Sequence, residues 1–354
     1  MQTIAGAAVS MFLLAGCVQL GPRALESGRP QYNIAVQQTE AQQLLLNIVR
    51  QRYNDPLMFL DVTSISSGYG RGMNASILGV LGTGNGTGTG AVGGNLGETP
   101  NIFYAPNTGE KFAKQMLTPL DLNTVALLLQ AGWSIERVFL LLAESVNDIY
   151  NRPVANDSGE RYARFLSLAD SLRDLQRDGF LTVGLERSEA EQGTALVLMI
   201  APDAAGRPSY RQVCETIGTE CNGAPLRMRQ AFGAPADSTT VALATRSLFS
   251  AIYHISRQVD VPAEDISTGV ASPSYDLAER TPAATEALRQ LFHVRSSKDE
   301  PERAAIKVNY RDAWFYIDDT DQDTKTTFAL LSMLITLQAG STGGVMPLIT
   351  IPSG

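Results

Sequence analysis

The sequence predicts an α+β fold, in which an α-rich segment that carries a long glycine-rich β-hairpin or loop is followed by a C-terminal α+β domain. Three observations support this prediction. Apolar residues recur at helical spacing in the first half of the chain, and residues 62–104 combine strand-like alternation with abundant glycine. In the second half, helical patterns interleave with short strand-like runs, which is typical of α+β folds.

The composition describes a folded chain with a sizeable core. Of 354 residues, 44% are hydrophobic and 18% are charged, which argues against a disordered protein and leaves room for about two domains. The net charge of −8 at pH 7 argues against nucleic acid as a partner and against electrostatic binding to anionic lipid. No apolar run reaches the roughly 18 residues of a membrane span, so we do not expect a transmembrane helix.

The N-terminus looks like an export signal that ends in a cysteine. The apolar run Ile4–Leu14 has the length of a signal-peptide core, and two small residues separate it from Cys17. The motif Leu14-Ala15-Gly16-Cys17 resembles the bacterial lipobox, although no Lys or Arg precedes it. The resemblance implies that residues 1–16 are a removed lipoprotein signal peptide and that Cys17 is lipidated. The alternative is an ordinary secretory signal peptide, or a short anchor helix, with an incidental cysteine.

The residues after Cys17 bear on where the body of the protein lies. Val18 and Gln19 follow, without the Asp that favours inner-membrane retention in enterobacterial lipoproteins. The resemblance therefore implies a protein anchored in the outer membrane, with its body in the periplasm and the membrane as a partner through the acyl chains. Residues 17–37 contain Gly, Pro and polar residues without a period, which predicts a tether between membrane and body.

Residues 38–152 are predicted to form the α-rich segment. A helix begins near Thr39 and stops at Asp55-Pro56, because apolar residues recur at helical spacing between these points and proline cannot continue a helix. Two apolar helices follow, at residues 122–131 and 134–150.

The stretch from Val62 to Gly97 contains twelve glycines in thirty-six residues, and Arg71 is its only charged residue. In its first arm, small polar residues alternate with bulkier ones, which is the period of a β-strand. The bulkier face consists of Ile65, Ser67, Tyr69, Arg71, Met73, Ala75 and Ile77.

Two interpretations of this stretch remain open. In the first, it is a long hairpin that pairs with other copies into an outer-membrane barrel. Tyr69, Arg71, Met73 and Ile77 would then contact the membrane or a neighbouring subunit. In the second, it is a mobile loop, which the entropic cost of ordering glycine favours.

Residues 157–354 are predicted to form the α+β domain, after a polar joint at 151–157 that we interpret as the domain boundary. The expected helices have an apolar face or a recognisable cap, and the expected strands are short apolar or alternating runs. The predicted helices are 160–178, 246–258, one that begins at Thr281-Pro282, and 323–338, which is apolar almost all round and should be buried. The predicted strands are 180–186, 194–201, 306–310, 313–317 and 346–351.

Two cysteines remain besides Cys17. Cys214 and Cys221 are close together in a polar stretch, which in an oxidising periplasm predicts a disulfide that closes a short loop. A metal site built from Cys and His is the rival interpretation. It needs more ligands, and the only histidines, His254 and His293, lie far along the chain.

No stretch of the sequence predicts an enzyme, a cofactor or a metal site. The motifs of serine hydrolases and zinc proteases are absent, and each histidine lies in a context that favours packing over catalysis. Asp319, Asp321 and Asp323 have the spacing that begins a calcium loop, but the later glycine and glutamate of such a loop are missing. We interpret these aspartates as favourable neighbours of the N-terminus of the next helix.

A second resemblance covers the first half of the chain at most. The runs Asn47-Ile48-Val49-Arg50 and Phe59-Leu60-Asp61-Val62, with Tyr53 and Asp55-Pro56 between them, resemble a set of uncharacterised proteobacterial lipoproteins. This resemblance implies no known activity. Cys17 is the one residue to which a resemblance, that of the lipobox, assigns a role.

The leading functional hypothesis is a non-enzymatic outer-membrane lipoprotein, an oligomeric or structural component of a cell-envelope assembly. Its partners would be the membrane, further copies of itself or other envelope proteins, and not nucleic acid. The alternative hypothesis is a periplasm-facing module that binds a ligand or partner and closes a mobile glycine-rich loop over it. A hydrolase that uses paired carboxylates, such as a glycosidase, is the third hypothesis.

Overall fold

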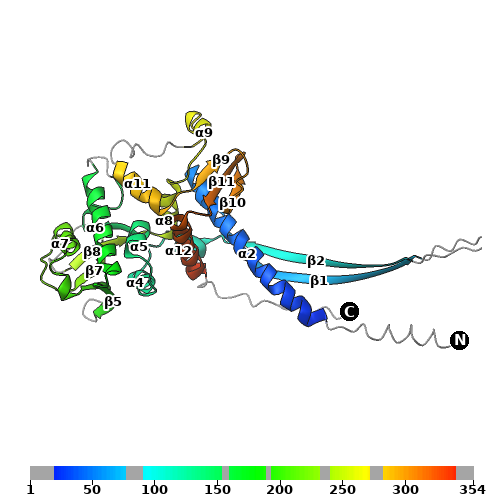
Figure 1. Cartoon of the computed structure of the whole chain (residues 1–354), viewed down its shortest axis with the longest axis horizontal. Helices are drawn as coiled ribbons and strands as arrows, with labels where there is room; N and C mark the ends of the chain where they lie inside the picture. The colour runs from blue at the N-terminus through cyan, green and yellow to red at the C-terminus, as the bar shows by residue number, and fades with distance from the viewer. Residues whose placement is uncertain are drawn as a thin grey trace, which may run out of the picture.

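The computed structural model describes residues 20–76, 91–153, 159–188, 193–231, 240–271 and 282–339 (Figure 1). The predicted α+β class is confirmed, because helices pack against a six-stranded and a three-stranded sheet, beside a separate two-stranded ribbon. Cys17 with the rest of the lipobox, Ile77 and the predicted strand 346–351 lie outside the described residues.

The elements of the first part of the chain include the ribbon and the longest helix. In order they are α2 (Leu20–Arg52), β1 (Leu60–Ser76), β2 (Ala91–Pro106), α3 (Glu110–Leu117), α4 (Leu122–Gln130), α5 (Ile135–Leu142), β3 (Ala143–Val146) and β4 (Ile149–Tyr150).

The second part of the chain alternates helices with short strands. In order its elements are α6 (Glu160–Arg177), β5 (Leu181–Ser188), β6 (Gly193–Ile200), the 3-10 helix η1 (Pro202–Ala204), α7 (Pro208–Ile217), β7 (Leu226–Gln230), β8 (Thr240–Thr245), α8 (Leu248–Ser256), α9 (Ala263–Ser267), α11 (Pro282–Leu291), β9 (Arg295–Ser297), β10 (Ala304–Tyr310), β11 (Ala313–Asp318) and α12 (Gln322–Ala339).

Helix α2 is much longer than the helix predicted from the sequence. It begins at Leu20 rather than near Thr39, so it occupies most of the region 17–37 that was expected to be a non-periodic tether. We call residues 29–40 the outer part of α2; their side chains are exposed, with two half-buried exceptions. Apolar periodicity reports only a face that packs against a core, so it could not reveal this part of the helix.

Of the two interpretations of the glycine-rich segment, the described residues form the hairpin. Strands β1 and β2 run antiparallel from the pair Leu60 and Pro106 to the pair Ser76 and Ala91. A bulge at Thr63 interrupts an otherwise continuous register. This pairing establishes the hairpin.

The six-stranded sheet has the strand order β4-β3-β8-β7-β6-β5, in which β7 and β8 run parallel and the other neighbours antiparallel. β3 and β4 precede the expected boundary at 151–157, and the other four strands follow it. The two predicted domains therefore share one sheet, and buried apolar residues from both belong to one cluster. The predicted strands 180–186 and 194–201 are confirmed as β5 and β6, which pair with each other.

The helix predicted over residues 134–150 is wrong beyond Leu142. Helix α5 ends there, and the chain continues into β3, turns at Asn147 and returns as β4. Asn147 has a φ of 51°, a left-handed conformation that asparagine adopts more readily than most residues. The run 138–146 is largely apolar, and in such a run the pattern alone cannot distinguish a buried helix from a buried strand.

The three-stranded sheet has the order β10-β11-β9 and contains the predicted strands 306–310 and 313–317, which are confirmed as β10 and β11. A two-residue turn, Arg311 and Asp312, joins them. Both residues have positive φ, as in the type I′ turns that match the twist of a hairpin.

The helices predicted in the second half are present as α6, α8, α11 and α12. The surroundings of α12 differ from the expectation that it would be buried on all sides. Phe328, Leu331 and Leu334 are buried, but Leu337 is 59% exposed. The last turn of α12 extends past the core and lines a surface groove, so its apolar residues are only partly covered.

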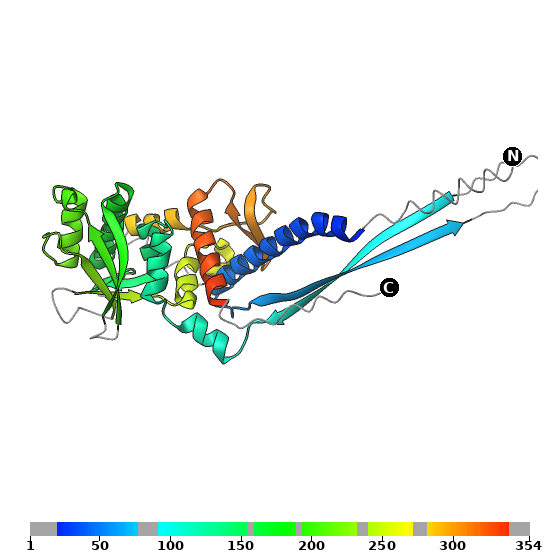
Figure 2. The ribbon, with the colours of Figure 1, turned by 90° about the horizontal axis from the view of Figure 1, so that it is seen from below.

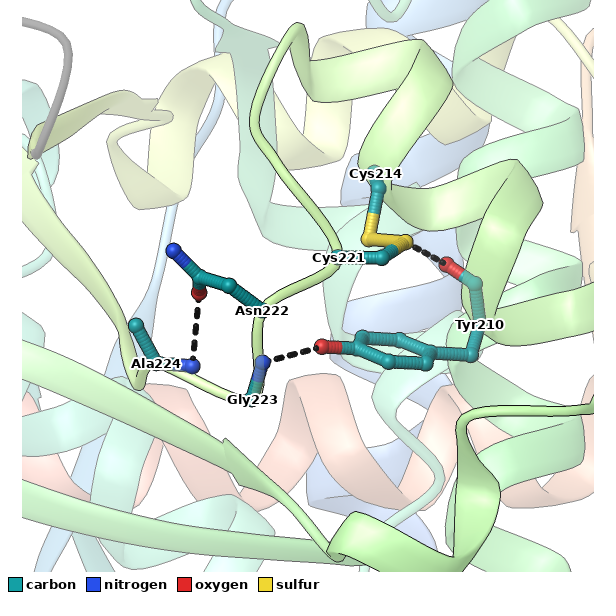
Figure 3. The surroundings of a disulfide bond; sticks show 6 residues. All are labelled: Tyr210, Cys214, Cys221, Asn222, Gly223 and Ala224. Atoms are coloured by element: carbon teal, nitrogen blue, oxygen red, sulfur yellow. Dashed lines mark hydrogen bonds between the residues drawn. A yellow bond between two sulfur atoms is a disulfide. The ribbon is translucent and has the colours of Figure 1, made fainter.

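Cys214 and Cys221, the two cysteines expected to pair, are bonded to each other, and their Cα atoms are 5.7 Å apart (Figure 3). Cys214 lies near the end of α7, and Cys221 lies in the loop that follows. The backbone N–H of Gly223 donates a hydrogen bond of 3.1 Å to the Tyr210 hydroxyl, so the buried tyrosine holds the same loop against α7.

Replacing both cysteines with serine is expected to lower the free energy of unfolding by about 2–3 kcal/mol, because the unfolded chain loses a cross-link between residues separated by seven positions. Urea denaturation followed by circular dichroism measures this change. Wild-type protein in a reducing agent is the matched control and should unfold with the same free energy as the double variant. A loss below about 0.5 kcal/mol would contradict the prediction.

Candidate functional site: the β-ribbon and its base

The β-ribbon, which consists of β1 and β2, is the most distinctive feature of the molecule. It extends away from the body as a long, twisted pair of strands (Figure 2). β2 has 16 residues, which corresponds to about 50 Å at ~3.3 Å per residue. Among the described residues, β1 and β2 pair with no other strand, so each presents an outer edge of backbone N–H and C=O groups.

Two side-chain amides of α2 hold the base of the ribbon. Asn47 donates a hydrogen bond to the Met58 carbonyl (2.8 Å) and accepts one from the Met58 N–H (2.9 Å). Gln43, one turn earlier, bonds Leu60 in the same way, at 3.2 and 2.7 Å. Gln43 and Asn47 are four helical residues apart, and Met58 and Leu60 are two residues apart in extended chain; both separations are about 6 Å. The two amides therefore match the backbone of residues 58–60 as a neighbouring strand would.

The base is also fixed from its other side. The backbone N–H of Asn107 donates to the Phe59 carbonyl (2.9 Å). The buried ring of Phe59 lies 5.9 Å from the ring of Phe112 on α3, measured between centroids. The ribbon is therefore attached to both α2 and α3 by buried or hydrogen-bonded contacts at its base.

Large apolar residues are exposed on the part of the ribbon nearest the body. Ile102, Phe103 and Tyr104 expose 43%, 57% and 59% of their surfaces. Because they are consecutive residues of one strand, they alternate between the two faces of the ribbon. Neighbouring exposed apolar residues of this size are typical of an interaction surface.

The residues predicted to contact a membrane or a subunit lie in the outer half of the ribbon, as far as they are described. Tyr69, Arg71 and Met73 of β1 are opposite Glu98, Leu96 and Gly94 of β2. The fourth, Ile77, lies outside the described residues. The register brings the positions of Arg71 and Glu98 within two residues of each other on neighbouring strands.

A groove of about 420 Å³ lies beside the base of the ribbon, between α2, α3 and α12. Its apolar lining includes Phe112 and Ile335, and its polar lining includes Gln43, Lys111 and Thr336. This volume is within the range of about 300–1,000 Å³ that small-molecule pockets occupy.

The C-terminal end of α2 is tied to the rest of the body by charged and aromatic residues. Asp55 accepts hydrogen bonds from the Tyr310 hydroxyl and from the Arg311 guanidinium at the turn between β10 and β11. The Tyr310 hydrogen bond, together with the Arg311 charge, lowers the pKa of Asp55. Tyr53 donates to Asp265 of α9, and burial, together with this carboxylate, raises the pKa of the Tyr53 hydroxyl.

The two histidines occupy different surroundings. His254 lies within α8, where burial, followed by the positive charge of Arg246, lowers its pKa well below the ordinary value. Nε2 of His293 lies 2.7 Å from Asp260 Oδ2 and 3.0 Å from the Arg289 guanidinium. Burial opposes ionisation of Asp260, but the His293 hydrogen bond and the neighbouring positive charges outweigh it and lower the pKa of this carboxyl. The second histidine therefore belongs to an ion-pair cluster.

The three aspartates with calcium-like spacing each have a protein partner at the start of α12. Asp321 accepts a hydrogen bond from the Thr324 N–H (3.0 Å), which caps the helix. Asp319 pairs with Lys325 at 2.8 Å, and Asp323 pairs with Arg137 at 2.7 Å. In the part of the chain that the structure describes, no cluster of three or more His, Cys, Asp or Glu residues could hold a metal ion.

No protein-family model, no curated protein and no solved structure matches this chain. Of the helices that the structure describes, none is both long enough and apolar enough to cross a membrane.

Proposed function

We propose that this protein is a non-enzymatic, lipid-anchored component of the bacterial outer membrane that assembles with copies of itself through the edges of its β-ribbon. The observation that carries the proposal is a pair of long strands with no third strand among the described residues. An isolated two-stranded hairpin is marginally stable in water, and open strand edges pair readily with other strands. Pairing between copies would stabilise the hairpin and cover its open strand edges.

The length and composition of the ribbon support a place in an outer-membrane assembly. A tilted strand crosses a bilayer in about 9–11 residues, whereas β1 has 17 residues and β2 has 16. From Gly72 to Gly97 the sequence contains no charged residue. Within a bilayer, strands satisfy their backbone groups only in a closed barrel, and two strands cannot close one, so several chains must contribute.

The direction of α2 supports a lipid anchor on the same side as the ribbon. Cys17, the proposed site of lipidation, precedes Leu20 by three residues. In both views the N-terminal end of α2 leaves the body on the side from which the ribbon extends (Figures 1 and 2). An acylated Cys17 would therefore bring the ribbon towards the membrane and concentrate it beside other copies.

The exposed apolar residues near the body support contact between copies. Ile102, Phe103 and Tyr104 cover both faces of the ribbon, and their own chain leaves them in water. Side-by-side packing of several ribbons and their bodies would bury part of this surface, and burying apolar area contributes roughly 25 cal/mol per Å².

A second candidate function is a periplasm-facing module that binds a small ligand or a partner segment. The groove between α2, α3 and α12 favours it, because it combines an apolar wall with Lys111 and several amides. In this case the protein would act as a single copy, and the ribbon would be a contact arm rather than part of a barrel.

Size in mild detergent distinguishes the two functions. The lipidated protein, extracted from membranes and analysed by size-exclusion chromatography with light scattering, is expected to contain at least about four chains, because the smallest membrane barrels have about eight strands and each chain supplies two. A single-chain mass under the same conditions would contradict the proposal and favour the binding module.

A further inference from the structure

Helix α2 contacts the base of the ribbon and, towards its N-terminus, slants away from it on the side of the body from which the ribbon extends (Figures 1 and 2). Its hydrogen bonds to the ribbon start at Gln43 and Leu60, and its N-terminal end reaches about the middle of the ribbon in both views (Figures 1 and 2). The middle of β1, which has 17 residues, is Gly68, next to Tyr69.

The outer part of α2 requires water around it. Its exposed residues are mostly polar or charged, and they include Arg29, Gln31, Asn33, Gln37, Gln38, Thr39 and Glu40. Placing a charged side chain at the centre of a bilayer costs at least about 2.5 kcal/mol, and the outer part of α2 carries two, Arg29 and Glu40. The space beside the inner half of the ribbon is therefore aqueous.

Charged residues along the ribbon stop at about the same distance from the body as the N-terminal end of α2. Arg71 and Glu98, whose positions the register brings close together, are the last charged residues before the uncharged stretch 72–97. Tyr69 is the register partner of Glu98. Tyrosine and arginine are suited to the headgroup region, where an apolar body meets lipid and a polar end meets water.

From these two independent measures we propose that the bilayer surface nearest the body crosses the ribbon at Tyr69 and Arg71, opposite Glu98 and Leu96. The inner half of the ribbon, 60–68 and 99–106, then stands in the periplasm, as does the outer part of α2. The inference rests on the proposed outer-membrane function and adds the position of the membrane to it. It also places the acyl chains of Cys17, three residues before α2, at the same level as the surface that they must enter.

Tryptophan fluorescence in vesicles tests where the membrane begins. The full-length lipidated protein is reconstituted into vesicles of phosphatidylethanolamine and phosphatidylglycerol that contain a small fraction of nitroxide-labelled lipid. Two variants report on the inner half, Phe103→Trp and Tyr104→Trp, and two report on the outer half, Met73→Trp and Asn74→Trp. Adjacent residues of a strand point to opposite faces, so one member of each pair faces lipid wherever the ribbon is in the bilayer.

The expected result is that nitroxide lipid reduces the added emission of at least one outer-half variant by about twofold or more, and leaves that of both inner-half variants nearly unchanged. Spectra of the wild-type protein supply the background from Trp133 and Trp314. Leu127→Trp is the body control, because Leu127 is exposed on α4 and a tryptophan in its place should not be quenched by lipid.

Strong quenching of either inner-half variant would place the membrane at the base of the ribbon and overturn the inference. So would the absence of quenching in both outer-half variants, even if the oligomer forms. The proposed assembly is judged separately by the detergent sizing: a single-chain mass together with quenching of the outer pair alone would retain this membrane position and reject the oligomer.

Discussion

Replacing Arg246 with methionine is expected to lower the free energy of unfolding by about 3–5 kcal/mol, because several buried carbonyl oxygens lose their hydrogen-bond donor together. Arg246 is buried and donates to the carbonyls of Ala143 (2.7 Å) and Asn151 (2.8 Å). It also lies 3.4 Å from the carbonyls of Leu140 and Leu141, in the last turn of α5. Methionine fills a similar volume but leaves these acceptors without a donor.

The guanidinium remains charged despite its burial. Removal from water lowers the pKa of Arg246 to about 10, while the charge of Glu144 acts in the opposite direction. At neutral pH the side chain is therefore still protonated. Its positive charge faces the carbonyl end of α5, where the partial negative charge of the helix dipole stabilises a cation.

Urea denaturation of three variants tests this account. Arg227→Met is the matched control, because Arg227 forms a solvent-exposed ion pair with Glu186, and its loss should cost less than about 1 kcal/mol. Arg246→Lys keeps the charge but lacks the planar fork, so its cost should lie between the two. If Arg246→Met were no more destabilising than Arg227→Met, the buried hydrogen bonds would not be what holds the end of α5.

Helices and strands with one buried face could be predicted from the sequence. Elements whose ends are fixed by contacts with residues far along the chain could not. Helix α6 was expected at nearly its observed bounds because Tyr162, Phe165 and Leu172 recur at helical spacing and are all buried. The end of α5 was missed because its last carbonyls bond to Arg246, about a hundred residues later in the chain. The apolar run through this point looks the same in a helix and in a strand.

In the candidate site, too, features with a local sequence pattern could be predicted, and features set by tertiary contacts could not. Alternation along β1 predicted a strand, but β2 was ambiguous because its glycines carry no side chains that could alternate. The pairing of Gln43 and Asn47 with the ribbon was not predicted at all. One signal was present: two amides lie four residues apart on a helix whose neighbouring residues, such as Leu44 and Ile48, are apolar and buried. Their partners are set by tertiary contact, which no local pattern contains.

Deleting residues 66–97 is expected to abolish the oligomer completely and to leave the body folded. The deletion joins Ile65 to Glu98, and Ile65 keeps its partner Ile102, so residues 98–101 become a four-residue loop that closes a short hairpin. The amide contacts from α2 to the base of the ribbon remain in place. The lost part contains most of both strand edges, which the proposed assembly uses for pairing between copies.

The matched control replaces residues 77–90 with Asn-Gly. It joins Ser76 to Ala91, which are partners in the register, through the two-residue turn that hairpins favour, and it keeps every described pair of the ribbon. In mild detergent the strands can pair without having to span a bilayer, so light scattering should give a single-chain mass for the deletion and the wild-type mass for the control. An oligomer that survives the deletion would show that copies meet elsewhere. Both variants keep the N-terminal anchor and the base, so a difference in mass between them can come only from residues 66–76 and 91–97.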